Sequence, residues 1–262
     1  MSAELDLGAY LRRIGLAAAP AADLEGLRTL HFAHATSIPF ENLDIQLGLP
    51  IRLDLASLQA KLVARRRGGY CFEHNTLFQA ALKSLGFEAM ACEARVRFGA
   101  LEISSRSHML LLVHLEGAIW LCDVGFGGEG LLHPVPLDGA AHTQFLNTYR
   151  VAEERRLRVL QSFHDDAWTD LYAFEPEPRF PIDFIVGNHY TSTYPDSRFL
   201  TTLTAQLPGP EVRRILRNRA YAELRGEQAE GRELAPGEVI PMLRDVFGID
   251  VPEGARFRAF EA

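Results

Sequence analysis

Cys71 is the residue whose setting in this sequence best suits covalent chemistry. It follows the turn Gly68-Gly69-Tyr70 and begins a stretch, 71–85, whose apolar residues recur at helical spacing. A helix N-terminus presents unpaired N–H groups and a partial positive charge, which favour a thiolate over a thiol. The same N–H groups could hold the oxyanion of an acyl-transfer intermediate. The alternative is a small buried side chain that packs beneath the turn.

The other two cysteines have settings typical of a protein core. Cys92 lies on the apolar side of the alternating segment 90–98, and Cys122 lies within the apolar run 119–122. Three cysteines are an odd number in a chain long enough to fold without disulfides, which fits a reducing compartment. We therefore expect a cytoplasmic protein with free thiols.

A predicted hairpin supplies a base for a reactive cysteine. The apolar runs 108–115 and 118–124 are joined by Glu116-Gly117, a hairpin signal. If these two residues are the loop, His108 and Asp123 become diagonal neighbours on one face, roughly 7 to 8 Å apart at Cα. A loop with an even number of residues preserves this arrangement, whereas a three-residue loop destroys it. If the loop has an even number of residues, the sequence predicts that the imidazole of His108 lies beside the carboxylate of Asp123.

A carboxylate within an apolar strand is costly unless it is paired and hydrogen-bonded, and an adjacent imidazole removes that cost. Cys71, His108 and Asp123 thus form a candidate nucleophile, base and orienting acid. The alternatives are that His108 is a satisfied core histidine and that Asp123 caps the glycine-rich turn 125–128.

Composition and charge argue against several other functions. The chain has 262 residues and a formal charge of -7, which argues against nonspecific binding to nucleic acid or anionic membranes. Arg65, Arg66 and Arg67 are either a local anion site or a solvated face. The acidic N-terminus does not fit a signal peptide, and no apolar run is long enough to span a membrane. No four-ligand set accompanies His31 and His34 or the C-x-x-H pair Cys71 and His74, so we expect no metal.

Helices dominate the first third of the sequence and strands the middle. Helical spacing predicts helices over 5–14, 24–34 with Asp23 as its cap, 54–64, 71–85 ending at Gly86, and 238–247. Strands are predicted over 90–98, in the hairpin, and within 145–162 and 199–224. We therefore expect an α+β fold with a helical unit over 1–86, a strand-rich unit over 87–190 and a mixed unit over 191–262.

Four blocks of the sequence resemble the arylamine N-acetyltransferases. They are SIPFENLDI (37–45), RRGGYCFEHN (66–75), RSHMLLLV (106–113) and WLCDVGFGG (120–128), in the same order as in that family. The match is close over the first half of the chain. The last third is similar mainly in its strands followed by a helix that ends in FGIDVP.

The resemblance implies a cysteine-protease-like pairing of a helical bundle with a β-barrel, followed by an α/β lid. It implies that Cys71 carries an acetyl group from acetyl-CoA to an aromatic amine or hydrazine, with His108 as base and Asp123 as orienting acid. Its implied acceptor-pocket residues are Phe40, Phe126 and Phe199, and its implied coenzyme A contacts are Ser104, Ser105, Gly127 and Gly128. An ion pair between Glu41 and Arg67 is also expected, the alternative being that these side chains lie exposed at the surface.

Two kinds of alternative function remain open at this point. The same three residues would serve a cysteine hydrolase, in which water resolves the acyl-enzyme, or an amide synthase that closes a larger ring. A non-catalytic binding protein with an inert Cys71 is the remaining alternative. We expect no nucleic-acid or membrane partner.

Overall fold

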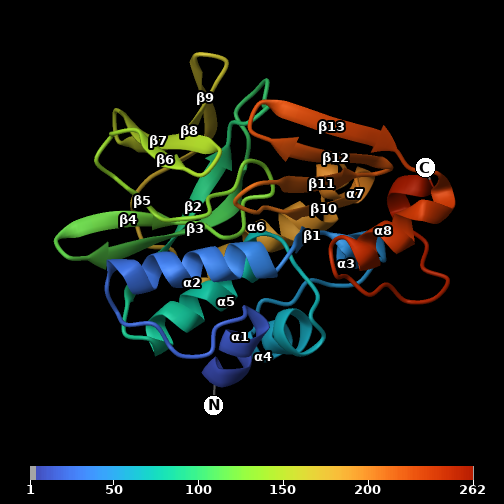
Figure 1. Cartoon of the computed structure of the whole chain (residues 1–262), viewed down its shortest axis with the longest axis horizontal. Coiled ribbons are helices and arrows are strands. Elements are labelled where there is room, and N and C mark those ends of the chain that lie inside the picture. The colour runs from blue at the N-terminus through green and yellow to red at the C-terminus, as the bar shows by residue number, and fades with distance from the viewer. Residues whose placement is uncertain (1–3, 262) are drawn as a thin grey trace.

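The computed structural model describes residues 4–261 and places most helices on one side of two antiparallel sheets (Figure 1). The N-terminal helices lie beneath the first sheet, and the C-terminal helix α8 lies against the second. The helices are α1 (Leu7–Arg13), α2 (Leu24–Ser37), α3 (Leu43–Gln46), α4 (Leu55–Leu58), the π-helix η1 (Gln59–Ala64), α5 (Cys71–Ser84), α6 (Pro181–Thr193), α7 (Arg198–Thr201), the 3₁₀ turn η2 (Pro236–Glu238), α8 (Val239–Asp245) and the 3₁₀ turn η3 (Arg258–Phe260).

The larger sheet has eight strands in the order β5-β4-β3-β2-β9-β8-β7-β6. It curls like a barrel, and the edge strand β5 comes close to β7. Its strands are β2 (Glu88–Val96), β3 (Arg106–Leu115), β4 (Ala118–Cys122), β5 (Val135–Pro136), β6 (His142–Gln144), β7 (Asn147–Glu154), β8 (Leu157–His164) and β9 (Ala167–Phe174). This arrangement confirms the α+β fold with a barrel-like sheet.

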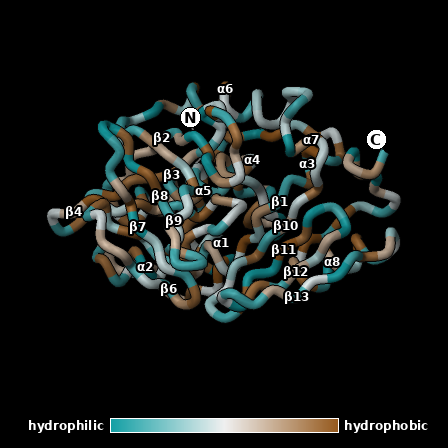
Figure 2. The backbone as a smooth tube through the Cα atoms, turned by 90° about the horizontal axis from the view of Figure 1, so that it is seen from above, coloured by the Kyte–Doolittle hydropathy of each residue, from teal (hydrophilic) through white to brown (hydrophobic). Residues whose placement is uncertain are grey.

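The smaller sheet joins distant parts of the chain. Its order is β1-β10-β11-β12-β13, which Figure 2 shows as a ladder on one side of the molecule. The strands are β1 (Phe40–Glu41), β10 (Thr204–Leu207), β11 (Arg213–Arg217), β12 (Ala220–Arg225) and β13 (Gln228–Glu233). The edge strand β1 comes from the PFEN block and pairs with β10, so the N-terminal segment completes a C-terminal sheet.

Strand β3 is buried on both faces, as its sequence predicts. Leu111 and Val113 pack into the core shared with the helices, whereas Leu110 and Leu112 pack into the interior of the curled sheet. A third core lies between the smaller sheet and α8. Cys92 and Cys122 are fully buried, which confirms their prediction as core residues.

Helix boundaries follow local capping chemistry. The Asp23 side chain accepts a hydrogen bond from the Gly26 N–H (2.8 Å) at the start of α2, as predicted. Gly86 has a φ of 89° just beyond α5, as expected of a helix-stopping glycine. None of the helices formed by residues 4–261 is both long and apolar enough to cross a bilayer.

Several segments depart from the sequence-based expectation, among them β9 and β13, which lie outside the expected strand regions. Residues 181–193 form α6, for which the sequence analysis predicted no helix, and residues 198–201 form a helical turn where strand was expected. Local caps explain both: Asp183 accepts the Phe180 N–H (2.8 Å), and the Ser197 hydroxyl accepts the Phe199 N–H (3.3 Å).

Candidate active site

The hairpin β3–β4 brings His108 and Asp123 together. Leu115 pairs with Ala118, and both loop residues, Glu116 and Gly117, have positive φ (52° and 77°), as a type I′ turn requires. The loop therefore has an even number of residues and the predicted parity holds. His108 Nε2 lies 2.7 Å from Asp123 Oδ2, and both side chains are buried.

Asp123 is held by several further hydrogen bonds. Its Oδ1 accepts from Asn75 Nδ2 (2.9 Å) and from the Gly125 N–H (2.9 Å), while its own N–H donates to His31 Nε2 (3.2 Å). Burial opposes ionisation, but His108 and these donors outweigh it, so the pKa of Asp123 is lowered. Asp123 thus both partners His108 and caps the glycine-rich turn, so its two sequence-based interpretations are compatible.

The surroundings of His108 favour its protonated form. Burial disfavours its charged form, but the Asp123 carboxylate and the adjacent Cys71 side chain raise the pKa of His108 to about 10. Its ring also packs against Tyr172 and Phe126, with centroid separations of 4.8 and 5.2 Å. Because Nε2 faces Asp123, Nδ1 is the ring nitrogen left for another partner.

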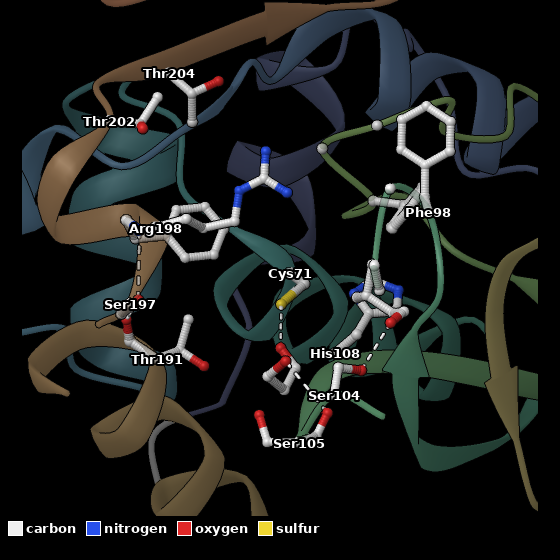
Figure 3. A pocket seen from close by; sticks show the side chains of 18 of the residues that line it. Cys71, Phe98, Ser104, Ser105, His108, Thr191, Ser197, Arg198, Thr202 and Thr204 are labelled. Carbon is white, nitrogen blue, oxygen red and sulfur yellow. Dashed lines mark hydrogen bonds between the residues drawn. The ribbon is translucent and has the colours of Figure 1, made fainter. Parts of the chain in front are cut away.

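The turn before Cys71 is fixed by the PFEN block. The Glu41 N–H donates to the Gly69 carbonyl (2.7 Å), and the Gly69 N–H donates to the Pro39 carbonyl (3.3 Å). Cys71 is the first residue of α5, and its Sγ donates to the Ser107 carbonyl (3.7 Å; Figure 3). Its side chain is buried, as the alternative of a small core residue beneath the turn predicts, but it also lines a cavity, as a reactive thiol requires.

One cavity of about 420 Å³ is lined by every site residue predicted from the sequence except the buried Asp123. Cys71 and His108 line it together (Figure 3). Its wall also includes the three aromatic residues Phe40, Phe126 and Phe199, and the four residues Ser104, Ser105, Gly127 and Gly128. Asp123 lies behind His108 and does not itself line the cavity.

The expected ion pair between Glu41 and Arg67 is present at 2.8 Å and is largely buried. Arg67 also contacts Asp44 (3.0 Å), and Lys61 joins Asp44 (2.7 Å) to Glu73 (2.8 Å). Burial alone would lower the pKa of Arg67, but the charges of Glu41 and Asp44 raise it. Arg67 is therefore occupied by carboxylates and is not available as an external anion site.

Sequence reasoning missed Asn75 and misjudged His31. Asn75 lies four residues after Cys71, one turn along the same helix face, and this spacing is a signal that could have identified it. His31 drew attention only as a possible metal ligand. Its Nδ1 lies 3.1 Å from the Leu132 carbonyl, which fixes Nδ1 as the donor and leaves Nε2 to accept from Asp123.

The buried His34 and His74 belong to a hydrogen-bonded chain. Tyr10 Oη lies 2.8 Å from His34 Nδ1, His34 Nε2 lies 3.0 Å from His74 Nδ1, and His74 Nε2 lies 3.1 Å from the Pro39 carbonyl. The carbonyl can only accept, so each imidazole is satisfied in its neutral form. This chain supports the segment that holds the Cys71 turn.

The curled sheet, the helices packed beneath it and the cavity that contains Cys71 and His108 form an α+β architecture that matches a solved acetyltransferase. A family model described as "N-acetyltransferase" matches residues 23–256. The chain belongs to the arylamine N-acetyltransferase family.

Individual relatives are similar over nearly their whole length. An arylamine N-acetyltransferase of Mycolicibacterium smegmatis is 40% identical over 94% of this chain and 93% of its own. The crystal structure of the Nocardia farcinica arylamine N-acetyltransferase is 42% identical, covers 96% of this chain and 92% of its own, and has a TM-score of 0.89. The Mycobacterium marinum enzyme, solved in complex with CoA, is 37% identical over 93% of each chain, with a TM-score of 0.88.

Proposed function

We propose that this protein transfers an acetyl group from acetyl-CoA to an arylamine or arylhydrazine by a ping-pong mechanism through an acetyl-cysteine at Cys71. The observation that supports it most is the meeting of Cys71 and the buried His108–Asp123 pair at one cavity. In the first half-reaction the thiolate attacks the thioester carbonyl, and the tetrahedral intermediate expels coenzyme A. In the second, the amine attacks the acetyl-cysteine and regenerates the thiolate.

His108 manages the protons of both half-reactions. With Nε2 held by Asp123, Nδ1 takes the thiol proton and gives it to the departing coenzyme A sulfur. In the second half-reaction it takes the proton that the attacking amine must lose. The raised pKa of His108 supports storage of that proton as an imidazolium beside the thiolate.

Phe40, Phe126 and Phe199 form the acceptor walls in this proposal. Phe40 and Phe199 pack together at a centroid separation of 6.2 Å, and Phe126 packs at the edge of the His108 ring. Planar apolar walls suit an aromatic ring, and the low basicity of aromatic amines leaves them uncharged for attack at neutral pH.

Ser104, Ser105, Gly127 and Gly128 are the proposed coenzyme A contacts. They line the cavity on the side of the loop before β3 and of the turn after β4, where a pantetheine arm could reach Cys71. The CoA complex of the Mycobacterium marinum relative supports a coenzyme A site on this fold. No metal takes part in the proposed chemistry.

The proposal also covers the roles of three segments of the chain and the cellular location of the protein. The segment 1–86 would supply the nucleophile, 87–190 the base and acid, and 191–262 a lid that carries Phe199. All three cysteines are free, which supports a reducing cytoplasm.

Intact-protein mass spectrometry tests the scheme. Incubation with acetyl-CoA without acceptor should add one acetyl group, and addition of an aniline should remove it with formation of the anilide. The variant Cys71→Ala should take up none, whereas the matched control Cys92→Ala should still be acetylated. Labelling that survives Cys71→Ala would overturn the proposal. Free acetate formed in place of the anilide would indicate a hydrolase, and reaction only with a tethered amine would indicate an amide synthase.

A further inference from the structure

The segment 125–130, which follows β4, forms part of the cavity wall but is neither helix nor strand. Four of its six residues are glycine. Glycine loses more conformational freedom on folding than any other residue, so such a segment keeps one conformation only if its surroundings hold it. Its start is held by Asp123, whose carboxylate accepts the Gly125 N–H (2.9 Å).

The rest of the segment is held from the smaller sheet. Arg213 on β11 donates from Nη1 to the Gly128 carbonyl (2.7 Å) and from Nη2 to the Gly130 carbonyl (2.8 Å). Gln206 on β10 donates from Nε2 to the Gly127 carbonyl. Two side chains thus fix three carbonyl groups of the segment.

The register of β10 and β11 brings these two side chains together. Gln206 pairs with Ile215, which lies two residues from Arg213 on the same strand, so the side chains of Gln206 and Arg213 share one face of the sheet. The next residue, Arg214, lies on the opposite face and pairs with Glu223 (3.4 Å). Both donors to the segment therefore come from a single surface.

Arg213 is buried without a counter-charge. It is 8% exposed, and among residues 4–261 no carboxylate oxygen lies within 4.0 Å of its guanidinium nitrogens. Buried arginines are rare unless they are paired. The partners of Arg213 are main-chain carbonyls, which the planar fork of a guanidinium group can hold at two points at once. Because a buried unpaired charge costs free energy, this arrangement indicates a role in fixing the segment rather than in stability alone.

The conformation of the segment determines the acceptor wall. The Phe126 ring packs against His108 and Tyr172, with centroid separations of 5.2 and 5.1 Å. Gly127 lies so close to the Phe40 ring that no side chain would fit between them. A shift of the segment would therefore move both aromatic rings relative to each other.

We propose that Arg213 and Gln206 are positioning residues that set the affinity for the aromatic acceptor. By holding the segment 125–130, they place Phe126 and Phe40 against the acceptor ring. The inference rests on the proposed function and adds two residues that act on the acceptor through the main chain of this segment. They are not required for the transfer of the acetyl group itself.

Two nucleophiles separate the acceptor wall from the chemistry. In a ping-pong reaction, kcat/KM for the acceptor reports only the reaction of the acetyl-enzyme with that acceptor, so it does not depend on how acetyl-CoA binds. Aniline needs the aromatic wall, whereas hydrazine has no ring and does not. The ratio of kcat/KM for aniline to kcat/KM for hydrazine therefore measures the contribution of the wall.

Arg213→Met should lower this ratio about tenfold, because methionine keeps an apolar stem but donates to neither carbonyl. The loss should appear mainly as a higher KM for aniline, while kcat/KM for hydrazine stays close to the wild-type value. Arg214→Met is the matched control and should leave the ratio unchanged, since Arg214 lies on the other face of β11. An equal loss with both nucleophiles would overturn the proposal.

Gln206→Met provides a second route if Arg213→Met does not fold. It removes a neutral donor to the Gly127 carbonyl, so the ratio should fall in the same direction by a smaller factor. A wild-type ratio in folded Gln206→Met would then overturn the proposal.

Arg213→Lys distinguishes the fork from the charge. Lysine keeps the charge but presents a single ammonium group, so it cannot hold two carbonyls in the geometry of a guanidinium group. The ratio in Arg213→Lys should lie between those of Arg213→Met and the wild-type protein. Full recovery by lysine would contradict positioning by the fork.

A double-mutant cycle tests whether Arg213 acts through Phe126. In a Phe126→Ala background, Arg213→Met should lower the aniline-to-hydrazine ratio much less than it does alone. Effects of the two substitutions that simply add would contradict this route.

The two levels of the argument fail in different ways. Absence of Cys71 acetylation in the wild-type protein would overturn the proposed function and this inference with it. Normal acetylation of Arg213→Met and Gln206→Met, together with a wild-type aniline-to-hydrazine ratio, would overturn the inference alone.

Discussion

Gly125 lies so close to Cys71 that a side chain does not fit between them. A Cβ at Gly125 would lie 2.8 Å from the Cys71 Cα and 2.9 Å from Asn75 Nδ2. The turn that follows β4 and the helix that begins at Cys71 are therefore in direct backbone contact. This contact fixes the separation between the thiol and the His108–Asp123 pair.

Gly125→Ala should therefore impair the site and the fold together. The methyl group meets backbone atoms of α5 that cannot move without moving Cys71, so we expect destabilisation of about 1–3 kcal/mol and a large loss of Cys71 acetylation. Thermal unfolding and the acetylation rate measure the two effects. Gly237→Ala is the control, because nothing lies within 4 Å of a Cβ there; equal behaviour of the two variants would contradict the tight contact.

Asp123→Asn should lower the rate of Cys71 acetylation by about 10² to 10⁴-fold with a folded protein. The variant removes the charge that raises the pKa of His108, so the imidazolium is lost at a lower pH than in the wild-type protein. Rapid-quench acetylation measured across pH should show this shift. Wild-type rates in the folded variant would contradict an orienting role for Asp123.

Asn75→Ala should weaken the support of Asp123 without removing any reacting group. Asn75 bonds the Asp123 carboxylate, the Met109 carbonyl (2.8 Å) and the Val124 N–H (3.2 Å), all buried. We expect destabilisation of about 1–3 kcal/mol and a smaller loss of acetylation than in Asp123→Asn. Urea unfolding and steady-state kinetics provide the comparison. Thr76→Ala, one residue further on, serves as the control. A greater loss of stability or of acetylation in Thr76→Ala than in Asn75→Ala would count against the support of Asp123 by Asn75.

Mild acid should destabilise the protein through its buried neutral histidines. Burial lowers the pKa of His31 and of His74 to about 4, whereas in the unfolded chain each has its ordinary value near ~6.5. The unfolded chain therefore binds more protons between these values, so stability is complete above pH ~6.5 and falls as the pH drops toward 4. Each histidine contributes about 2 kcal/mol of this loss by pH 5.

Urea unfolding at a series of pH values measures that loss. His31→Gln should flatten the dependence between pH 6.5 and 4, since it removes one of the titrating groups. A stability that does not change over this interval would show that these imidazoles titrate in the folded protein with the same pKa as in the unfolded chain.

The relationship between His108 and Asp123 could be predicted from the sequence because it is local in a strand pair. A period of two and a turn of known length determine which side chains share a face, without knowledge of the fold. The helix that begins at Cys71 was predictable for a similar reason. The positions of Phe40 and Phe199 at the same cavity came only from the family resemblance.

The parts that escaped prediction depend on tertiary contacts or on ambiguous periodicity. His31 reaches Asp123 only because α2 packs beneath β4, which no spacing along the chain reveals. Helix α6 carries apolar residues on its exposed face, such as Ile182 and Val186, so its amphipathic pattern is blurred. The face shared by Gln206 and Arg213 requires the register of two C-terminal strands.

The pairing of β1 with β10 has a consequence for the order of assembly. Asn42 bonds the Thr202 carbonyl (2.8 Å) across 160 residues of chain, and the adjacent Glu41 holds the turn that presents the thiol. A nascent chain that has not yet emerged as far as β10 lacks this brace. Cys71 is therefore made early in synthesis, but the turn that presents it gains this brace only after β10 has emerged.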